Sequence, residues 1–219
     1  MINFDPFSRI TFHIKTLDTD IHGLRYFPSL EPGISNDVSE PPYGWLTDVE
    51  VSDGNIHVVK EVIKRLGTSL TTILDIGLNR DDDRSLSRVL LDNRPGNSFY
   101  LGVGPEDMSR VANPVTNTWT LQSESTDQVV VRSFLNQHGV SKLDLILIDG
   151  YHSVNAAIND WRYADLLSDH GVVIMHDTNS HPGCVALYNA IDDDRFFKER
   201  YCTMNDFGIA VIQRKPGIR

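Results

Sequence analysis

The 219-residue sequence has few cysteines, no excess of positive charge and no long apolar run. Its two cysteines, Cys184 and Cys202, are too few for a disulfide framework and lack the spacing of a metal-binding motif. The formal net charge of -10 argues against nucleic acid or an anionic membrane as the main partner. No apolar stretch approaches the roughly 20 residues that a membrane helix needs. We therefore expect a reduced, cytoplasmic protein with no nucleic-acid partner and no membrane partner.

Several sequence motifs are also absent. The first residues, MINFDPFSRITFHIK, lack a basic flank followed by an apolar core, so we expect no secretory signal. A G-x-G-x-x-G fingerprint and a P-loop are missing, which weakens a nicotinamide or flavin function. The sequence also lacks a G-x-S-x-G elbow and an H-E-x-x-H helix, so serine hydrolases and zincins have no support.

Residues 1–54 differ in composition from the rest of the chain. Proline and glycine interrupt this segment too often for long helices or strands. Its aromatic residues, among them Phe12, Tyr43 and Trp45, are unusual for a free tail. We expect an irregular N-terminal extension that packs on the following domain, as a structural cover, a lid over a site or an oligomer contact. A homo-oligomer is therefore one of the open alternatives.

Helical and strand patterns alternate over residues 55–219. Helical spacing of apolar residues appears over about 56–66, 84–91, 127–138, 154–167 and 184–191. Short apolar or β-branched runs predict strands at about 69–76, 98–103, 117–122, 143–148, 172–175, 197–202 and 207–213. Strands that are apolar on both faces and alternate with helices are typical of a parallel, doubly wound sheet. The sequence therefore predicts one α/β domain over residues 55–219.

Acid and imidazole side chains follow two consecutive predicted strands. Asp149 and His152 come after the first of these strands, and His176 and Asp177 after the second. Neighbouring strands lie about 5 Å apart, so these groups would converge at the edge where open α/β sheets bind ligands. Carboxylates suit Mg²⁺ or Mn²⁺, two imidazoles also suit Zn²⁺ or Fe²⁺, and an uncoordinated histidine could accept a proton. In the alternative, Asp149 or Ser153 only caps the next helix and His176 is a core imidazole.

A second candidate site follows the first predicted strand. Asp75 and Gly77 end that strand, and a helix begins near Ser85, an arrangement that can present backbone N–H groups to a charged ligand. An ordinary turn explains these residues equally well. The segment from Thr120 to Asp127 has the composition of a helix capping box, and the acidic triplet 81–83 that of a solvated loop.

The order of these segments resembles the class I S-adenosylmethionine-dependent methyltransferases. Within them, the chain is similar to the small-molecule O-methyltransferases that include methyltransferase family 24, macrolide sugar O-methyltransferases and cephalosporin-hydroxylase-like proteins. The resemblance covers about residues 56–214 and is most specific at LDLILIDGYHS and DLLSDHGVVIMHDT. It implies a Rossmann-like, seven-stranded sheet of order 3-2-1-4-5-7-6 with strand 7 antiparallel.

The resemblance also implies roles for individual residues. His152 matches a general base, and Asp149, His176 and Asp177 match the positions of the metal ligands. Gly104 falls where the family places the acid that binds the ribose. The implied cofactor-binding residues are Asp75, Gly77, Ser85, Gly104, Glu124, Ser125 and Asp149.

The leading hypothesis is a cytoplasmic enzyme that uses S-adenosylmethionine and a divalent metal, Mg²⁺ or another, to methylate a hydroxyl of a small molecule such as a sugar or natural product. The alternative is a degenerate methyltransferase-like protein that has lost cofactor binding and acts as a binding or assembly module. Gly104 and the acidic loop motivate that alternative. A third hypothesis keeps the metal site for other chemistry.

Overall fold

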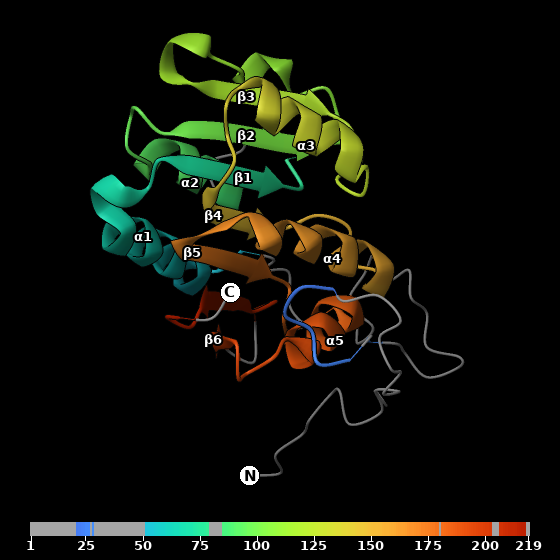
Figure 1. Cartoon of the computed structure of the whole chain (residues 1–219). Coiled ribbons are helices and arrows are strands. Elements are labelled where there is room, and N and C mark those ends of the chain that lie inside the picture. The colour runs from blue at the N-terminus through green and yellow to red at the C-terminus, as the bar shows by residue number, and fades with distance from the viewer. Residues whose placement is uncertain are drawn as a thin grey trace.

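A seven-stranded sheet with the strand order β3-β2-β1-β4-β5-β7-β6 forms the centre of the molecule (Figure 1). The computed structural model describes residues 21–26, 28, 51–78, 85–179, 181–202 and 206–217. The strands are β1 Thr72–Ile76, β2 Phe99–Gly104, β3 Thr118–Gln122, β4 Leu143–Ile148, β5 Leu167–His176, β6 Phe196–Tyr201 and β7 Ile209–Arg214. β7 runs antiparallel to both β5 and β6, and the remaining pairs are parallel. The predicted strand order, including the antiparallel seventh strand, is confirmed.

Helices cover both faces of the sheet (Figure 1). They are α1 Asp53–Leu66, α2 Leu86–Asn93, α3 Gln128–Gln137, α4 Val154–Trp161 and α5 Pro182–Ala190, with short 3₁₀ turns at Gly67–Ser69, Ser109–Val111, Pro114–Thr116 and Arg162–Leu166. Apolar residues of α1 and α2 pack on one face, and those of α3, α4 and α5 on the other. The sheet is therefore the middle layer of three, which explains why its central strands are apolar on both faces.

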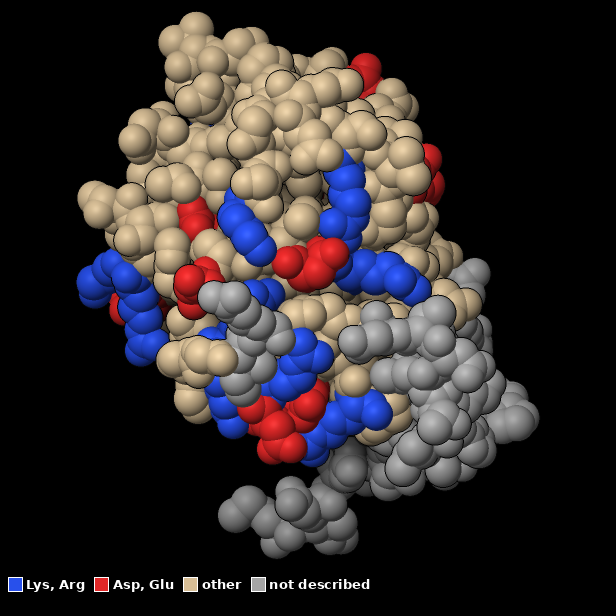
Figure 2. All heavy atoms as spheres, in the orientation of Figure 1, with Lys and Arg blue, Asp and Glu red and all other residues tan. Residues whose placement is uncertain are grey.

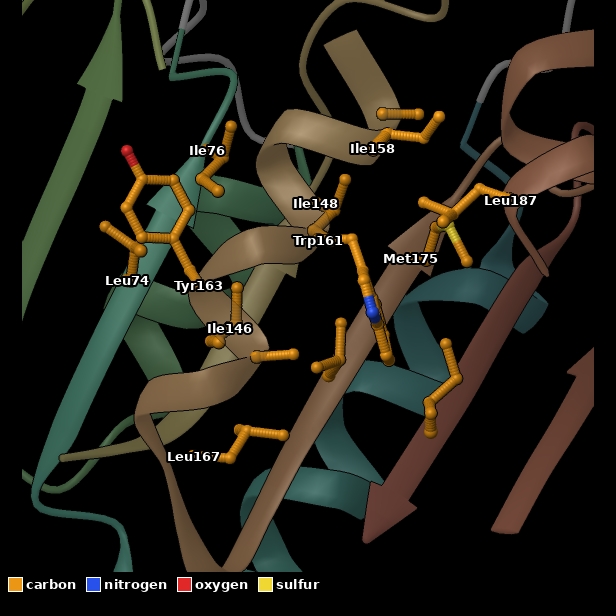
Figure 3. Close-up of a cluster of buried hydrophobic side chains, with 14 of the residues drawn as sticks. Leu74, Ile76, Ile146, Ile148, Ile158, Trp161, Tyr163, Leu167, Met175 and Leu187 are labelled. Carbon is orange, nitrogen blue, oxygen red and sulfur yellow. The ribbon is translucent and has the colours of Figure 1, made fainter. Parts of the chain in front are cut away.

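The larger part of the core lies between the sheet and α3, α4 and α5. Trp161 is fully buried and lies among apolar side chains of β4, β5 and α5 (Figure 3). Every residue of β4 is buried, including Asp144. Each Å² of apolar surface that is buried stabilises the fold by about 25 cal/mol, so this larger layer is the main stabilising contact of the sheet. It holds the ends of β4 and β5 in fixed positions.

The boundary between α4 and β5 differs from the prediction. The helical pattern predicted a helix as far as Leu167, but α4 ends at Trp161, a 3₁₀ turn follows, and Leu167 already belongs to β5. Tyr163 and Ala164 remain buried in the 3₁₀ turn, so the apolar spacing continues past the end of the helix. The first part of β5 is irregular, because its register with β4 shifts after Leu143. Polar residues at the start of β5 interrupt the apolar run, so the sequence pattern did not predict that the strand begins at Leu167.

Residues 21–26 pack against α4 and α5. The indole N–H of Trp161 donates to the His22 carbonyl at 2.8 Å, and Leu24 forms an isolated bridge with Ile191. Arg25 Nε lies 2.7 Å from Asp192 Oδ1. Most of the N-terminal extension, residues 1–20, 27 and 29–50, lies outside the described residues, as does the acidic triplet 81–83.

Charged side chains of opposite sign lie next to one another across the middle and lower parts of the face shown in Figure 2. The ion pairs include Arg132 with Asp165 at 3.0 Å and Lys198 with Asp193 at 3.1 Å. In the part of the chain that the structure describes, no helix has the length and apolar character to cross a membrane.

Candidate functional site

Five acid and imidazole side chains meet at the carboxyl ends of β4 and β5. We call this group the acid–imidazole cluster: Asp149, His152, His176, Asp177 and His181. His176 Nδ1 lies 2.9 Å from Asp149 Oδ1 and 3.2 Å from Asp177 Oδ1. The other oxygen of Asp177, Oδ2, contacts His152 Nε2. The convergence expected from the two strand ends is therefore present, and His181 joins it.

Asp177 adopts a backbone conformation that brings two consecutive side chains to the same place. Successive residues of a strand point to opposite faces, so His176 and Asp177 would diverge if β5 continued. Asp177 instead has φ of +59°, in the left-handed region that few residues other than glycine occupy. Its carboxylate consequently turns toward His176. Such a backbone at a buried acid is typical of functional sites.

The imidazoles of His152 and His181 are stacked. Their ring centroids are 4.0 Å apart and their planes differ by 19°. His181 precedes α5 and is buried, whereas the side chain of His152 is 24% exposed. Gly183 makes this approach possible, because a β-carbon there would lie 2.0 Å from the His152 carbonyl oxygen. The start of α5 therefore packs tightly on the loop that carries His152.

Asn55 is a residue of the site that the sequence did not indicate. It lies in the first turn of α1, where its backbone N–H donates to the N-cap Ser52. Its side chain is buried, and Nδ2 lies 3.2 Å from His176 Nε2. The sequence offered only an asparagine on the inward face of a helix, 121 positions away from its partner.

Burial and mutual attraction set the charges of the cluster. Burial lowers the pKa of His176, but the carboxylates of Asp177 and Asp149 outweigh it and raise that pKa well above its usual value. The pKa of His152 is raised for the same reason, with Asp177 as the main partner. Conversely, the two imidazoles hold the pKa of Asp177 far below its ordinary value although burial opposes this. Without another cation, protons on the histidines balance the buried carboxylates.

The helix caps decide one alternative that the sequence left open. Ser153 is the N-cap of α4, and its hydroxyl accepts a hydrogen bond from the Ala156 N–H at 3.2 Å. Asp127 caps α3 in the same way. Asp149 therefore does not cap α4, and its carboxylate faces His176.

The ends of β1, β2 and β3 form a second region, which we call the β1–β3 rim: Gly77, Leu78, Gly104, Glu124 and Ser125. The N–H groups of Gly77 and Leu78 both donate to the Val103 carbonyl, at 2.9 and 3.1 Å. A β-carbon at Gly77 would lie 2.0 Å from the Asp149 carbonyl oxygen, and one at Gly104 would lie 2.2 Å from that of Leu78. Both glycines are therefore required by close contacts within the chain.

The remaining predicted cofactor residues lie around this rim. Ser85 is the N-cap of α2 and accepts from the Arg88 N–H. Glu124 is exposed, and the Ser125 carbonyl accepts from the Tyr163 hydroxyl at 2.7 Å. Asp75 is fully buried in β1, where the Tyr100 hydroxyl donates to Oδ2 at 2.5 Å. Burial raises the pKa of Asp75 to about 6, and its Oδ1 has no hydrogen-bond partner.

The two regions differ in how well they fit a ligand. Asp177 Oδ1 in the acid–imidazole cluster is buried and lacks a hydrogen-bond partner, so a metal ion fits there. In β1, the orphaned oxygen of Asp75 fits the positive charge of an ammonium or sulfonium ligand such as S-adenosylmethionine. At the end of β2, Gly104 supplies no side chain for the ribose. The fit to that cofactor is thus partial, whereas Asp149, His176 and Asp177 place three ligand atoms within 4.8 Å of one another, close enough to hold a metal ion.

Comparison with known proteins adds information at the level of the fold. No protein-family profile matches the sequence, and no curated protein matches it. Among solved structures, the MycE methyltransferase of the mycinamycin biosynthetic pathway, in complex with Mg, S-adenosylhomocysteine and mycinamycin VI, matches with a TM-score of 0.52 and 13% identity. The match covers 73% of this chain and 48% of MycE, so the chain spans about half the length of that protein.

A second similar structure is a Clostridium thermocellum protein described as an rRNA methylase. It matches with a TM-score of 0.55 and 11% identity over 77% of this chain and 99% of its own length. Similarity at such low identity concerns the fold alone, because one fold supports many functions. Together with the strand order and the antiparallel seventh strand, it shows that this chain has the class I methyltransferase fold.

Proposed function

We propose that this protein is an S-adenosylmethionine-dependent O-methyltransferase that acts, with the help of a divalent metal, on a hydroxyl of a small molecule. The observation that carries the proposal is the acid–imidazole cluster, which lies in a methyltransferase fold at the sheet edge where ligands bind. The complex of MycE with Mg and S-adenosylhomocysteine supports it by similarity of fold.

Asp149, His176 and Asp177 would hold the metal. Their ligand atoms lie within 4.8 Å of one another. A metal bound there would hold the acceptor oxygen and lower the pKa of its hydroxyl. The protein contributes a buried, rigid position for that oxygen, because β4 and β5 are fixed by the core on both faces.

His152 would take the proton of the hydroxyl. Asp177 contacts Nε2, so a neutral ring with its proton on Nε2 leaves the lone pair of Nδ1 free to accept a proton. An aspartate that holds one ring nitrogen in this way fixes the tautomer and stabilises the imidazolium that forms. The stacked ring of His181 restricts the rotation of His152 and so acts as a positioning residue.

The cofactor would bind over the β1–β3 rim. In this arrangement the Asp75 carboxylate attracts its positive charge, and Glu124 and Ser125 lie where the adenine is expected. Ser85, at the start of α2, would lie near its methionine carboxylate. The segment 79–84 between Leu78 and Ser85 is outside the described residues, so this part of the proposal rests on the family resemblance.

Titration calorimetry with S-adenosylmethionine and S-adenosylhomocysteine, each with and without Mg²⁺, tests the proposal. We expect both ligands to bind and to raise the melting temperature, since a ligand that binds only the native state stabilises it. If neither ligand gives heat or a thermal shift under any condition, the enzyme function is wrong.

That negative outcome would favour the alternative, a methyltransferase-like protein that serves as a binding or assembly module. Two observations support the alternative. Gly104 has no acidic side chain to bind a ribose, and the N–H groups of Gly77 and Leu78, which follow β1, donate to the Val103 carbonyl and not to a ligand. A variant of the buried acid in β1 beside the rim, Asp75→Asn, separates the two cases further. It should weaken cofactor binding in an enzyme and leave a module without cofactor binding unaffected.

A further inference from the structure

We infer that the acid–imidazole cluster binds a transition-metal dication, such as Co²⁺ or Zn²⁺, in preference to Mg²⁺, and that Asn55 sets the tautomer of His176 that this binding needs. The inference deepens the metal part of the proposed function and rests on it, but not on cofactor binding. It follows from three features: the spacing of the ligand atoms, the imidazole among them, and the buried amide behind that imidazole.

The spacing of the three donor atoms matches that of neighbouring ligands on one small ion. Ligands about 2.1 Å from a metal and at right angles to one another are separated by about 3 Å. His176 Nδ1 lies 2.9 Å from Asp149 Oδ1 and 3.2 Å from Asp177 Oδ1. Asp177 Oδ1 is buried without a hydrogen-bond partner, so it offers a free lone pair toward this position.

The central ligand is a nitrogen atom. Mg²⁺ selects oxygen ligands and retains several of its waters, whereas imidazole nitrogen suits Zn²⁺, Fe²⁺ and other transition metals. His176 is 1% exposed and lies between the two carboxylates, so an ion that contacts both of them also meets Nδ1. His152 and His181, whose ligand atoms lie within 4.8 Å of that of Asp177, add to the nitrogen character of the surroundings.

Asn55 lies on the far side of the His176 ring and controls its proton. With Nδ2 of Asn55 facing Nε2, the amide donates to an unprotonated Nε2, and the proton of a neutral ring lies on Nδ1. A half-turn of the amide places its oxygen against Nε2 instead. Nε2 then carries the proton, and the Nδ1 lone pair is free for a metal. The two amide orientations have the same shape, so the turn requires no repacking.

An outer hydrogen-bond partner of this kind is usual for metal-binding histidines, and its loss typically lowers metal affinity 10- to 100-fold, on the order of the effect expected here. The Asn55 side chain is buried, and its helix is capped by Ser52, whose hydroxyl also donates to Asp206 Oδ2 at 3.0 Å. Asn55 is thus held firmly enough to act as a positioning residue for His176.

The test measures metal affinity directly. Protein freed of metal with a chelator is titrated with Co²⁺ and with Mg²⁺ by calorimetry, and the visible absorption of bound Co²⁺ is recorded. Four chains are compared: wild type, His176→Asp, Asn55→Leu and His170→Asn. His170 is the matched control, because it also pairs with an aspartate, Asp144 at 3.0 Å, but lies outside the cluster.

We expect the wild type to bind Co²⁺ at least about 100-fold more tightly than Mg²⁺. Most sites favour Co²⁺ to some extent, so the change in the variants is decisive. His176→Asp should weaken Co²⁺, strengthen Mg²⁺ and alter the Co²⁺ spectrum, and Asn55→Leu should weaken Co²⁺ by about 10-fold or more. His170→Asn should behave as wild type.

Equal affinity of the wild type for the two ions, or an unchanged Co²⁺ affinity in His176→Asp and Asn55→Leu, would overturn the inference. If His176→Asp fails to fold, the Co²⁺ spectrum of the wild type and the Co²⁺ titration of Asn55→Leu still decide whether the inference holds. Titration of the same wild-type protein with S-adenosylhomocysteine separates the two proposals. Metal binding without cofactor binding upholds the inference and rejects the proposed enzyme. Cofactor binding without metal binding overturns the inference and the metal-assisted step, and leaves cofactor binding in the proposed function supported.

Discussion

The acid–imidazole cluster and the β1–β3 rim lie at the same edge of one sheet, yet they satisfy their polar groups in different ways. In the cluster, buried and partly exposed side chains face one another, and one carboxylate oxygen of Asp177 has no hydrogen-bond partner. At the rim, the N–H groups of Gly77 and Leu78 are bonded within the chain. Unpaired buried side-chain oxygens, at Asp177 in the cluster and at Asp75 beside the rim, can accept a ligand, whereas the paired backbone groups of the rim contribute to stability.

The first prediction concerns the chemistry assigned to the cluster. His152→Asn should reduce methyl transfer to a hydroxyl acceptor by about 100- to 10,000-fold, because it removes the proton-accepting nitrogen. Release of S-adenosylhomocysteine, followed over a panel of small hydroxyl compounds, measures the effect. Binding of S-adenosylhomocysteine should persist. The control is His138→Asn, since His138 lies in an aromatic cluster with Trp119 and Phe134. An active His152→Asn enzyme would contradict the role of His152.

The second prediction breaks the contact between the two regions. Gly77 has φ of +103°, and a β-carbon there would lie 2.0 Å from the Asp149 carbonyl oxygen. Gly77→Ala should therefore lower the free energy of unfolding by about 4 kcal/mol, from backbone strain and overpacking together. Urea denaturation measures this free energy in the variant and in the wild type. Gly96→Ala, where nothing lies within 4 Å of the added carbon, should leave the stability nearly unchanged. Similar losses in both variants would show that the close contact is unimportant.

The third prediction concerns Asp160 of α4, a buried carboxyl beside Gly150 that has no hydrogen-bond partner at either oxygen. Burial raises its pKa to about 7. The unfolded group ionises above about pH 4, whereas the folded group resists ionisation until pH 7, so the wild type loses stability as the pH rises between these values.

Asp160→Asn removes the ionisable carboxyl and therefore the loss of stability at high pH. The variant should match the wild type near pH 4 and exceed its free energy of unfolding by roughly 4 kcal/mol at pH 8. Denaturation at both pH values measures the difference. A stability change of equal size at pH 4 and pH 8 would mean that ionisation of Asp160 plays no part.

The fourth prediction sharpens the role of Asp75, the buried acid in β1 beside the rim. Tyr100→Phe removes the hydroxyl that donates to its buried carboxylate, so the free energy of unfolding should fall by about 1–3 kcal/mol. The affinity for S-adenosylhomocysteine should change little, since Asp75 Oδ1 remains for the ligand. Tyr163→Phe, which loses a bond to a neutral carbonyl, should destabilise the protein less. Cofactor binding that disappears in Tyr100→Phe would contradict this division of roles.

Much of the fold could be predicted because burial leaves a periodic trace in the sequence. The apolar run at β4 and the helical spacing at α1 and α3 identified these elements within a few residues. The start of β5 could not be predicted, because buried Tyr163 and Ala164 continue the helical pattern beyond the end of α4. Among the site residues, those that directly follow β4 and β5 were visible to this reasoning, and the position of His181 soon after Asp177 placed it near the same edge, whereas Asn55 was not visible.

The sequence by itself determined the alternation of buried strands and helices, and with it the edge at which Asp149, His152, His176 and Asp177 gather. Apolar periodicity is a local property, and strand ends in a parallel sheet must share an edge. Only the tertiary structure decided which groups touch. The left-handed backbone at Asp177, the ring of His181 on His152 and the amide of Asn55 behind His176 depend on contacts between distant segments. Those contacts make two strand ends into a candidate metal site.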